Sequence, residues 1–383
     1  MKLTRTIRLP LEAKPEDILP SLEAYTAAFN LVCKRGWQDS DSNGISLHHK
    51  TYSEAKALGL PSQLACSARV KATEALKSVQ ERIKQGRKAN CPQSKLIPIR
   101  LDARSFSIWF PKQICTIRLV NKRIEFKFKV PKFYEPLISW KQASADLVIR
   151  DNKVFLNMVV CKDVEDPVTN GKVIGIDAGI KRTAVTSANQ FFGGSVLSHT
   201  SLKYKKKRKA FQKKRHSGKR HLVKLKNKEN RFTSDFLHII SKKIVLTFKA
   251  GDVVAMEDLK GIRDRRLRKN SRTMLNAWAF DRLQFLLKYK TEAIGCLVVK
   301  VDPRYTSQTC SKCGHKEKAN RQTQSIFKCR KCGFSINADL NGSRNIACKG
   351  KLVAAKCGNQ GLPPTSLTAD ELLSSANAPA VLG

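Results

Sequence analysis

The sequence predicts a multidomain α+β protein, and three observations support this prediction. Strand patterns at the N-terminus and from Ser105 onward enclose a long stretch with helical periodicity. In the second half of the chain, short buried strands alternate with helices, which is typical of an α/β layer architecture. A closely spaced group of four cysteines near the C-terminus indicates a small metal-bound module. At 383 residues, the chain is long enough for two or three domains.

The charge balance indicates the class of partner. Lys and Arg number 73 against 31 acidic residues, which gives a formal net charge of +42. An excess of this size favours nucleic acid as the partner over a basic surface that serves solubility alone. No apolar run approaches the ~20 residues that cross a bilayer, and the first residues lack the apolar core of a secretory signal. We therefore expect a cytoplasmic protein with no membrane association.

The first half of the chain predicts a β-barrel with a helical insertion. Residues 1–12 alternate apolar and polar side chains and are predicted to form one strand. Residues 13–94 have helical periodicity, broken by the polar segment Gln38–Gly44. Alternation resumes in residues 95–170, which end in a hairpin with its turn at Asp151-Asn152. We expect 1–12 and 95–170 to share one barrel, although the pattern alone leaves a plain helical bundle open for 13–94.

Residues 171–348 are predicted to form an α/β domain, and residues 349–383 a mostly disordered tail rich in Ala, Ser, Pro and Leu. Within the α/β domain, Ser201–Arg231 is the most basic segment, with Glu229 as its one acid. Its composition favours helix, and its charge favours contact with RNA over a merely solvated basic helix. The candidate nucleic-acid-binding residues are Lys205, Lys206, Lys207, Arg208, Lys213, Lys214, Arg215, Lys219 and Arg220.

Four of the 12 cysteines form the most specific local motif, C-x₂-C-x₁₅-C-x₂-C. They are Cys310, Cys313, Cys329 and Cys332, and each pair is followed by a glycine that permits a tight left-handed turn. Two such turns give a closed tetrahedral thiolate site, the geometry of structural zinc. We therefore predict one zinc ion that stabilises the fold and does not catalyse, with two disulfides as the alternative. The other eight cysteines are scattered and are interpreted as reduced thiols.

Three carboxylates stand where apolar segments end. Asp177 follows the apolar run Val173–Ile176, and Glu257 ends the run Val253–Met256. Asp339 opens a helical stretch just past the cysteines. A carboxylate at the end of a buried strand is costly unless it binds a cation or a hydrogen-bond donor. Three converging carboxylates suit a pair of Mg²⁺ ions, which can activate water and stabilise the leaving oxygen of a phosphodiester.

Each acid taken singly also has a plainer explanation as a strand-end or capping residue, and Asp339 could be an ordinary helix N-cap. Their order along strands and helices, beside the cysteine motif, favours the catalytic interpretation. We predict Asp177, Glu257 and Asp339 as catalytic, magnesium-binding residues. The neighbouring Asp252, Asp258 and Asp302 are interpreted as structural.

Four segments carry a resemblance to a known family. They are Gly175–Ile180 (GIDAGI), Met256–Arg263 (MEDLKGIR), Tyr305–Gly314 (YTSQTCSKCG) and Cys329–Ala347 (CRKCGFSINADLNGSRNIA). Together they resemble TnpB, the RNA-guided nucleases of bacterial and archaeal insertion sequences, which are related to type V CRISPR effectors. The likeness covers about residues 1–348. One departure follows Asp339, where the chain reads Leu340-Asn341-Gly342-Ser343 and many relatives have two alanines.

The resemblance implies a domain organisation and a set of metals. An RNase H-like (RuvC) α/β nuclease core would span 171–348, with the Cys₄ zinc ribbon set into it at 305–336. Residues 1–12 and 95–170 would form a wedge-like β-barrel, interrupted by a helical recognition domain at 13–94. Asp177, Glu257 and Asp339 match the catalytic acids of the family, which hold Mg²⁺.

The resemblance also implies partners. A guide RNA from the end of the transposable element would bind the basic groove, and base pairing would select the target DNA beside a short motif. Arg304, just before the ribbon, is a candidate contact near the scissile phosphate. The protein would act as a monomer bound to RNA in the prokaryotic cytoplasm or nucleoid.

Two other functions fit parts of the sequence. A DNA transposase or its accessory protein would need the same acids, so the acids alone do not separate it from a guided nuclease. An RNA-guided repressor that binds DNA without cutting it would lack one or more of the acids, whereas all three are present here.

Overall fold

The computed structural model describes residues 1–167, 169–225, 227–262 and 278–358. The chain forms two compact units, Met1–Val164 and Glu165–Gly383. The boundary between them lies a few residues ahead of the one predicted at 170. None of the described helices combines the length and the hydropathy that a bilayer span needs.

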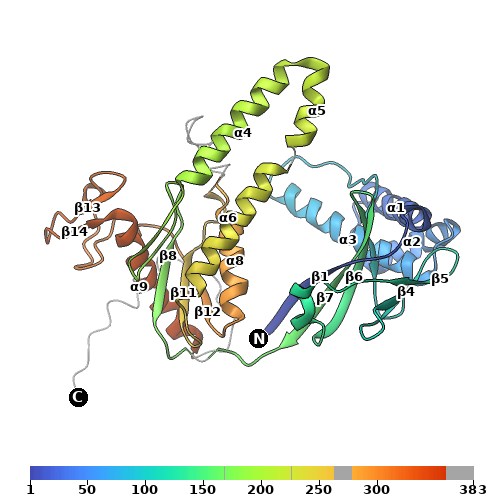
Figure 1. The fold of residues 1–383 in the computed structure, drawn as a ribbon, viewed down its shortest axis with the longest axis horizontal. Coiled ribbons are helices and arrows are strands. Elements are labelled where there is room, and N and C mark those ends of the chain that lie inside the picture. Colours follow the sequence, from blue (N-terminus) through green and yellow to red (C-terminus); the bar gives the residue numbers. More distant parts are fainter. Residues whose placement is uncertain (168, 226, 263–277, 359–383) are drawn as a thin grey trace. The chain divides into compact units, whose positions relative to one another are not determined.

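The strands of the first unit form two antiparallel sheets (Figure 1). The four-stranded sheet has the order β1-β7-β6-β2, so the first strand of the chain pairs with the last strand of the unit. The sequence predicted that this first strand joins the later strands, without specifying its partner. A bridge between Leu11 and Phe128 connects this sheet to the three-stranded sheet β3-β4-β5. The strands are β1 (Lys2–Pro10), β2 (Ile99–Leu101), β3 (Phe106–Trp109), β4 (Ile114–Arg118), β5 (Arg123–Lys127), β6 (Lys141–Arg150) and β7 (Lys153–Asp163), with the 3₁₀ helix η1 (Lys132–Leu137) before β6.

Three helices are inserted between β1 and β2: α1 (Pro15–Gln38), α2 (Gly44–Ala57) and α3 (Ser62–Lys84). The fully buried Tyr25 of α1 connects them to the sheet, because its hydroxyl contacts Ser67 Oγ at 2.7 Å and Ser67 in turn donates to the carbonyl of Arg100 at 2.7 Å. Burial raises the pKa of Tyr25 to about 12. The inserted helices therefore share a hydrophobic core with the strands.

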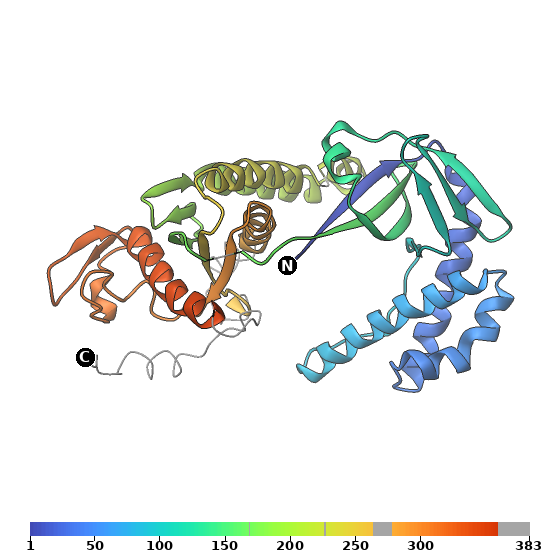
Figure 2. The ribbon, with the colours of Figure 1, turned by 90° about the horizontal axis from the view of Figure 1, so that it is seen from below.

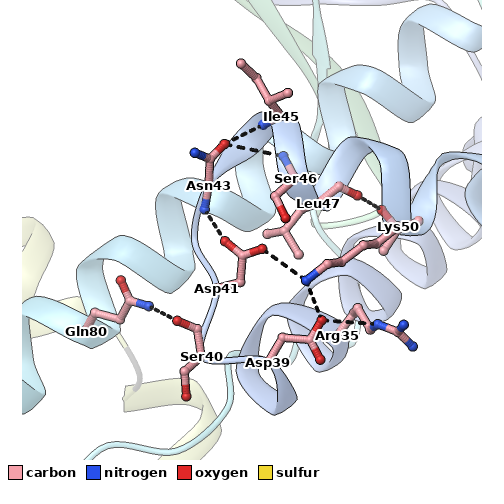
Figure 3. Close-up of polar contacts among 11 residues, drawn as sticks. Arg35, Asp39, Ser40, Asp41, Asn43, Ile45, Ser46, Leu47, Lys50 and Gln80 are labelled. Carbon is pink, nitrogen blue, oxygen red and sulfur yellow. Dashed lines mark hydrogen bonds and ion pairs between the residues drawn. The ribbon is translucent and has the colours of Figure 1, made fainter.

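The polar break that the sequence predicted between α1 and α2 is an ordered turn (Figure 3). Asn43 caps α2 by accepting hydrogen bonds from the backbone N–H groups of Ile45 and Ser46 at 2.8 and 3.4 Å. Lys50 Nζ lies 2.8 Å from Asp39 Oδ2 and 3.4 Å from Asp41 Oδ2, so one ammonium group binds two carboxylates of the turn. Short polar side chains thus supply hydrogen-bond partners for the backbone of the turn and for the first N–H groups of α2.

The second unit is built on a five-stranded sheet of order β10-β9-β8-β11-β12. Strand β11 runs parallel to its neighbours β8 and β12, whereas β9 and β10 are antiparallel additions at the edge. The strands are β8 (Val173–Asp177), β9 (Arg182–Thr186), β10 (Gln190–Gly193), β11 (Val253–Glu257) and β12 (Leu297–Val301). Since neighbouring parallel strands end at the same edge, the last residues of β8 and β11 are brought side by side.

Helices cover both faces of this sheet (Figure 2). One face, which includes Ile176 and Met256, packs on α6 (Lys228–Val245) and α8 (Phe280–Glu292). The other face packs on α9 (Ala338–Gly358), which approaches the backbone of Gly175 very closely. A Cβ on Gly175 would lie 2.0 Å from the carbonyl oxygen of Ser343, so this contact requires glycine.

Two predictions on the helices need correction. The mostly disordered tail is predicted to begin at residue 349, but α9 runs on to Gly358 because Val353 and Ala354 bury against the sheet. Residues 359–383 of the predicted tail lie outside the described residues. The basic segment covers most of α4 (Ser195–Lys213), α5 (Arg215–Leu225) and the first residues of α6, and Lys214 is extended and separates α4 from α5. The Lys and Arg residues around this break favour helix, whereas Ser217 and Gly218, which follow it closely, disfavour helix.

Candidate metal centres and basic helices

Asp177 and Glu257 occupy equivalent ends of neighbouring parallel strands. Met256 of β11 is in register with Ile176 of β8, so the next residues, Glu257 and Asp177, lie beside each other at the carboxyl edge of the sheet. This edge is where parallel α/β sheets bind ligands. The apolar runs before both acids are buried in the sheet, which fixes the strand ends and therefore the positions of the two carboxylates.

Asp339 reaches the same place from the first turn of α9. The side chain of Asn337 caps this helix, because its Oδ1 accepts hydrogen bonds from the N–H groups of Asp339 and Leu340 at 3.1 and 3.3 Å. The sequence left open that Asp339 itself is the N-cap. With Asn337 in that role, the carboxylate of Asp339 is left to face the other acids.

The three acids line one cavity of about 320 Å³. Its wall also includes Thr306 and Arg321, which come from segments far apart in the sequence. Gly342 on α9 completes the wall beside Asp177, since a Cβ on Gly342 would lie 3.2 Å from Asp177 Oδ2. The strand ends and α9 therefore bring the predicted acids together.

Converging negative charge dominates the electrostatics of this cavity. Burial raises the pKa of Asp177 to about 8, and the neighbouring charges of Glu257 and Asp339 contribute in the same direction. Arg321 lowers that pKa by a smaller amount. A carboxyl group with so high a pKa is stabilised in its charged form only by added positive charge, which a divalent cation supplies. The donor set of three carboxylates therefore fits Mg²⁺.

Three further residues, which were not predicted as partners of the acids, contact them. Thr306 Oγ1 donates a hydrogen bond to Glu257 Oε1 at 2.6 Å. Arg182 and Arg321 lie 3.7 and 3.8 Å from the carboxylate oxygens of Asp339, and Arg182 also donates to Asn337 Oδ1 at 2.8 Å. Because all three lie far in sequence from their partners, no local pattern could have found them.

Of the neighbouring acids, Asp252 and Asp302 have structural contacts, whereas Asp258 borders the cavity. Asp252 accepts hydrogen bonds from the backbone N–H groups of Lys172 and Lys249, both at 2.9 Å, before β11 begins. Asp302 accepts from the N–H of Arg304 at 3.0 Å. Asp258 borders the cavity, but its carboxylate lies 4.0 Å from Lys300 Nζ.

The four cysteines converge with the geometry of a tetrahedral metal site. Their Sγ atoms all lie within 4.8 Å of one another, with 3.8 Å between Cys310 and Cys332 and 3.6 Å between Cys313 and Cys329. Four thiolates about 2.3 Å from one zinc ion are separated by roughly 3.8 Å. The separations are much longer than the ~2.05 Å of a disulfide, which removes the alternative that the sequence left open. The cluster can therefore hold a zinc ion.

The two cysteine turns have the same backbone geometry. Gly314 and Gly333 have φ of +74° and +71°, and their N–H groups donate to the carbonyls of Cys310 and Cys329 at 2.9 and 3.0 Å. The fully buried Asn320 joins the two turns, since it donates to the carbonyl of His315 and accepts from the N–H of Arg330. The ribbon contains β13 (Ile326–Lys328), β14 (Ser335–Asn337) and the 3₁₀ helix η3 (Lys318–Asn320).

Backbone donors also tune the thiols. Desolvation raises the pKa of Cys329, but N–H groups of Cys332 and Lys331 outweigh it and bring that pKa to about 6. A thiol with a lowered pKa is more readily the thiolate that binds metal. Within the described residues, the four cysteines form the one group of His, Cys, Asp or Glu ligands packed this tightly. The three acids are more widely spaced around their open cavity.

The basic helices present most of their predicted contact residues to solvent. These exposed residues are Lys205, Lys206, Lys207, Lys213, Lys214, Lys219 and Arg220. Arg208 differs, because its guanidinium lies 2.5 Å from the carboxylate of Glu229 and connects α4 to α6. The side chain of Arg215 lies outside the described part of the chain. Helices α4 and α5 also contact each other through stacked rings of Phe211 and His221, whose centroids are 4.8 Å apart.

Two further candidates are placed by the structure. Arg304 is exposed in the segment between β12 and the ribbon, outside the lining of the acidic cavity. Among the aromatic residues of β3 to β5 and the residue after β5, Phe106, Phe126 and Phe128 are buried in the core, whereas Trp109 is half exposed and accessible for base stacking.

Two family models match the chain, almost entirely within the second unit. Residues 157–260, which contain Asp177 and Glu257, match a model described as a probable transposase. Residues 280–346, which contain Asp339 and the four cysteines, match a model of the TNB domain of Cas12f1-like proteins. The two matches thus cover all of the predicted acids and metal-binding cysteines.

Individual relatives agree with these matches. The chain is 30% identical over 256 residues to a TnpB-like protein of Methanocaldococcus jannaschii, which covers 62% of this chain and 87% of that protein. It is 35% identical over 238 residues to the CRISPR-associated endodeoxyribonuclease Cas12f1 of Sulfoacidibacillus thermotolerans, covering 54% of this chain. That match spans only 53% of the Cas12f1 chain, about half of its length.

A solved structure shares the fold. A cryo-EM structure of a Cas12f1–sgRNA–target DNA complex superposes with a TM-score of 0.64 over 86% of this chain and 82% of the Cas12f1 chain. The sequence identity in this comparison is 19%, so the likeness concerns the fold alone.

Proposed function

This chain belongs to the TnpB-like family, and on that premise we propose that it is an RNA-guided DNA endonuclease of a transposable element. It would cleave target DNA beside a short motif by metal-dependent hydrolysis of a phosphodiester. The observation that carries the proposal is the convergence of Asp177, Glu257 and Asp339 on one cavity at the carboxyl edge of the sheet. Homology alone would leave open whether the reactive groups meet.

The second unit is proposed to be an RNase H-like (RuvC) nuclease core with an inserted zinc ribbon. The order β10-β9-β8-β11-β12, with a meander at one edge and parallel strands at the other, supports this assignment. So does the chain path, which leaves the sheet at β12, forms the Cys₄ module and returns as α9 to the acids. In the first unit, residues 1–12 and 95–170 are proposed as the wedge-like barrel and 13–94 as the helical recognition domain.

Asp177, Glu257 and Asp339 would hold two Mg²⁺ ions. When bound, these ions supply an activated water and neutralise the charge on the leaving oxygen. The protein contributes a rigid carboxylate edge, since two ligands end adjacent strands and the third opens a helix capped by Asn337. Arg182 and Arg321 add fixed positive charge beside Asp339, where an anionic scissile phosphate approaches.

One structural zinc ion in the Cys₄ cluster is proposed to stabilise the ribbon. The buried ribbon core of Cys310, Cys329 and Phe327 includes Ala338, the residue directly before Asp339. Loss of the metal would therefore loosen the first turn of α9 as well as the ribbon.

Guide RNA from the end of the element and target DNA are the proposed partners, with the protein acting as a monomer bound to its RNA. The exposed lysines of α4 and α5 are proposed to contact RNA phosphates. Arg304 remains a candidate contact near the scissile phosphate, because its linker adjoins the cavity through Pro303 and Thr306.

A role in DNA transposition is the second candidate, because the model matching residues 157–260 is described as a probable transposase. The same acids would serve strand transfer. A guided repressor without cleavage is disfavoured by the complete set of acids around the cavity.

The test is to purify the protein with RNA expressed from its own locus and to sequence the bound RNA. Reprogramming that RNA should redirect Mg²⁺-dependent cleavage to a new target, and Asp177→Ala should abolish cleavage while sparing RNA binding. Asp163→Ala is the matched control, because Asp163 also ends a strand but is exposed and is not among the residues that line the acidic cavity. Absence of a discrete bound RNA, or cleavage that ignores the guide, would contradict the proposal.

A further inference from the structure

One face of α9 binds the backbone of the segment that leads from β12 into the ribbon. Asn341, Asn345 and Lys349 are spaced four residues apart and lie on the same side of the helix. Asn341 donates to the carbonyl of Thr309 at 2.8 Å and accepts from the N–H of Ser311 at 3.0 Å.

The other two members of this polar row extend the contact toward β12. Asn345 Nδ2 lies 2.8 Å from the carbonyl oxygen of Thr306 and 2.7 Å from that of Thr309. Lys349 Nζ donates to the carbonyls of Asp302 and Arg304 at 2.9 and 2.7 Å. Buried or half-buried side chains that satisfy successive carbonyls hold an irregular segment in one conformation.

Thr306 is the residue that this conformation presents to the acidic cavity. Its backbone carbonyl is bound by Asn345, and its side chain is buried with Oγ1 2.6 Å from Glu257 Oε1. Oγ1 also lies 3.0 Å from the carbonyl of Pro303, but a hydroxyl has one proton to donate. The closer, charged carboxylate is the stronger acceptor.

We propose that Thr306 is a positioning residue for Glu257, and that the polar row on α9 holds Thr306 in place. The hydroxyl engages one carboxylate oxygen and thereby restricts rotation of the carboxylate, so that the other oxygen is oriented for a metal ion. Helix α9 would thus supply one acid, Asp339, directly and orient a second through Thr306. This inference rests on the proposed function only in taking Glu257 as a metal ligand.

A metal-binding side chain that is not held in place loses conformational freedom when the metal binds. A glutamate side chain has three rotatable bonds. When it binds a metal ion it loses this freedom, and the lost entropy lowers the affinity of the site for the metal. Hydrogen bonds from neighbouring residues to a metal-binding side chain commonly contribute about 10-fold to 100-fold in metal affinity or activity. Thr306 Oγ1 donates such a hydrogen bond to Glu257 Oε1 at 2.6 Å.

The experiment is a titration of the full-length protein with Mn²⁺ in the absence of nucleic acid. The concentration of free Mn²⁺ is measured by electron paramagnetic resonance. Thr306→Val keeps the shape of the side chain and removes the hydroxyl, and it should weaken Mn²⁺ binding about 10-fold. Thr306→Ser restores a hydroxyl and should bind as the wild type does. In cleavage assays, Thr306→Val should raise the Mg²⁺ concentration for half-maximal rate about 10-fold and leave the KM for DNA unchanged.

Thr309→Val is the matched control, because Thr309 lies in the same segment and its hydroxyl donates to the carbonyl of Tyr305. It should bind Mn²⁺ as the wild type does. In a Glu257→Ala background, Thr306→Val should cause no further loss, since the acceptor of the Thr306 hydroxyl is gone. That non-additivity separates positioning from a general loss of stability.

Wild-type affinity for Mn²⁺ in Thr306→Val, or weak binding in Thr306→Ser, would overturn the inference. Equal losses with and without Glu257→Ala would do the same. If Thr306→Val did not fold, Thr306→Ala and Thr306→Ser would be compared in the same way. The titration uses no RNA or DNA, so it decides the role of Thr306 even if guided cleavage were never observed.

Discussion

Gly342 on α9 lies against the carboxylate of Asp177, and a Cβ added to Gly342 would stand 3.2 Å from Asp177 Oδ2. The atom that must give way is the end of a side chain, which can move by a few tenths of an ångström. Gly350, two turns along the same helix, is different, because a Cβ there would lie 2.3 Å from the Cβ of Ala255 in the sheet. The first helix turns thus tolerate side chains near the acids, whereas the later turns must lie close to β11.

This difference predicts that a glycine-to-alanine substitution changes stability in opposite directions at the two positions. Gly342→Ala should stabilise the protein by about 0.5–1 kcal/mol, because alanine favours helix over glycine by that amount. Gly350→Ala should destabilise it by about 1–3 kcal/mol through overpacking. Chemical denaturation of both variants checks the prediction, and a Gly342→Ala protein less stable than Gly350→Ala would contradict it.

The charge on Asp177 predicts a conflict between stability and activity. Its folded-state pKa of about 8 lies above the ordinary value of ~3.9, so ionised Asp177 costs stability in the metal-free protein as pH rises between these values. Asp177→Asn should therefore raise the metal-free Tm at pH 7, by about 2–4 °C for each kcal/mol relieved, and abolish cleavage.

Two conditions check the cause of that gain. Below pH ~4 the wild-type carboxyl is protonated in both states, so the difference in Tm should vanish. Saturating Mg²⁺ should stabilise the wild type and leave Asp177→Asn unchanged. Calorimetry across pH and Mg²⁺ measures both, and equal Mg²⁺ stabilisation of the two proteins would exclude Asp177 as a ligand.

The acids and cysteines were predictable because their signals are local. One signal is a carboxylate at the end of an apolar strand. The other is a pair of cysteines with two residues between them, followed by glycine. Both reflect geometry set by a few neighbouring residues. Thr306, Arg182 and Arg321 reach the acids only through the fold, and nothing near them in the sequence marks their partners. The break at Lys214 has only a weak local signal, because Ser217 and Gly218 after it stand among Lys and Arg residues that favour helix.

The zinc ribbon should couple to the acidic cavity. Cys329→Ser, or removal of zinc by a chelator, should abolish the one zinc per chain and lower Mg²⁺-dependent cleavage, because the ribbon core packs Ala338 beside Asp339. Cys348→Ser is the matched control, since Cys348 is exposed on α9 and outside the metal cluster. Elemental analysis and cleavage assays measure the outcome. Full zinc content in Cys329→Ser would show that another residue completes the site.

Basic residues of α4 should divide into two classes. Lys206 is exposed, so Lys206→Gln should weaken RNA binding and reduce the slope of log K against log salt by about 0.7–0.9 for one lost phosphate contact. Arg208 is paired with Glu229, so Arg208→Gln should leave that slope nearly unchanged and loosen the contact between α4 and α6, at a cost of about 0.5–1 kcal/mol.

The charge-swapped pair Arg208→Glu with Glu229→Arg separates these classes further. If the pairing matters, the swap should restore the hydrogen-exchange protection of α4 and α6 that either single change reduces, because the ion pair forms again in reverse. RNA affinity measured across a salt series should then match the wild type for the swap and stay weakened for Lys206→Gln. A swap that lowers RNA affinity as strongly as Lys206→Gln would instead place Arg208 among the phosphate contacts, since its new acidic side chain would repel the RNA backbone.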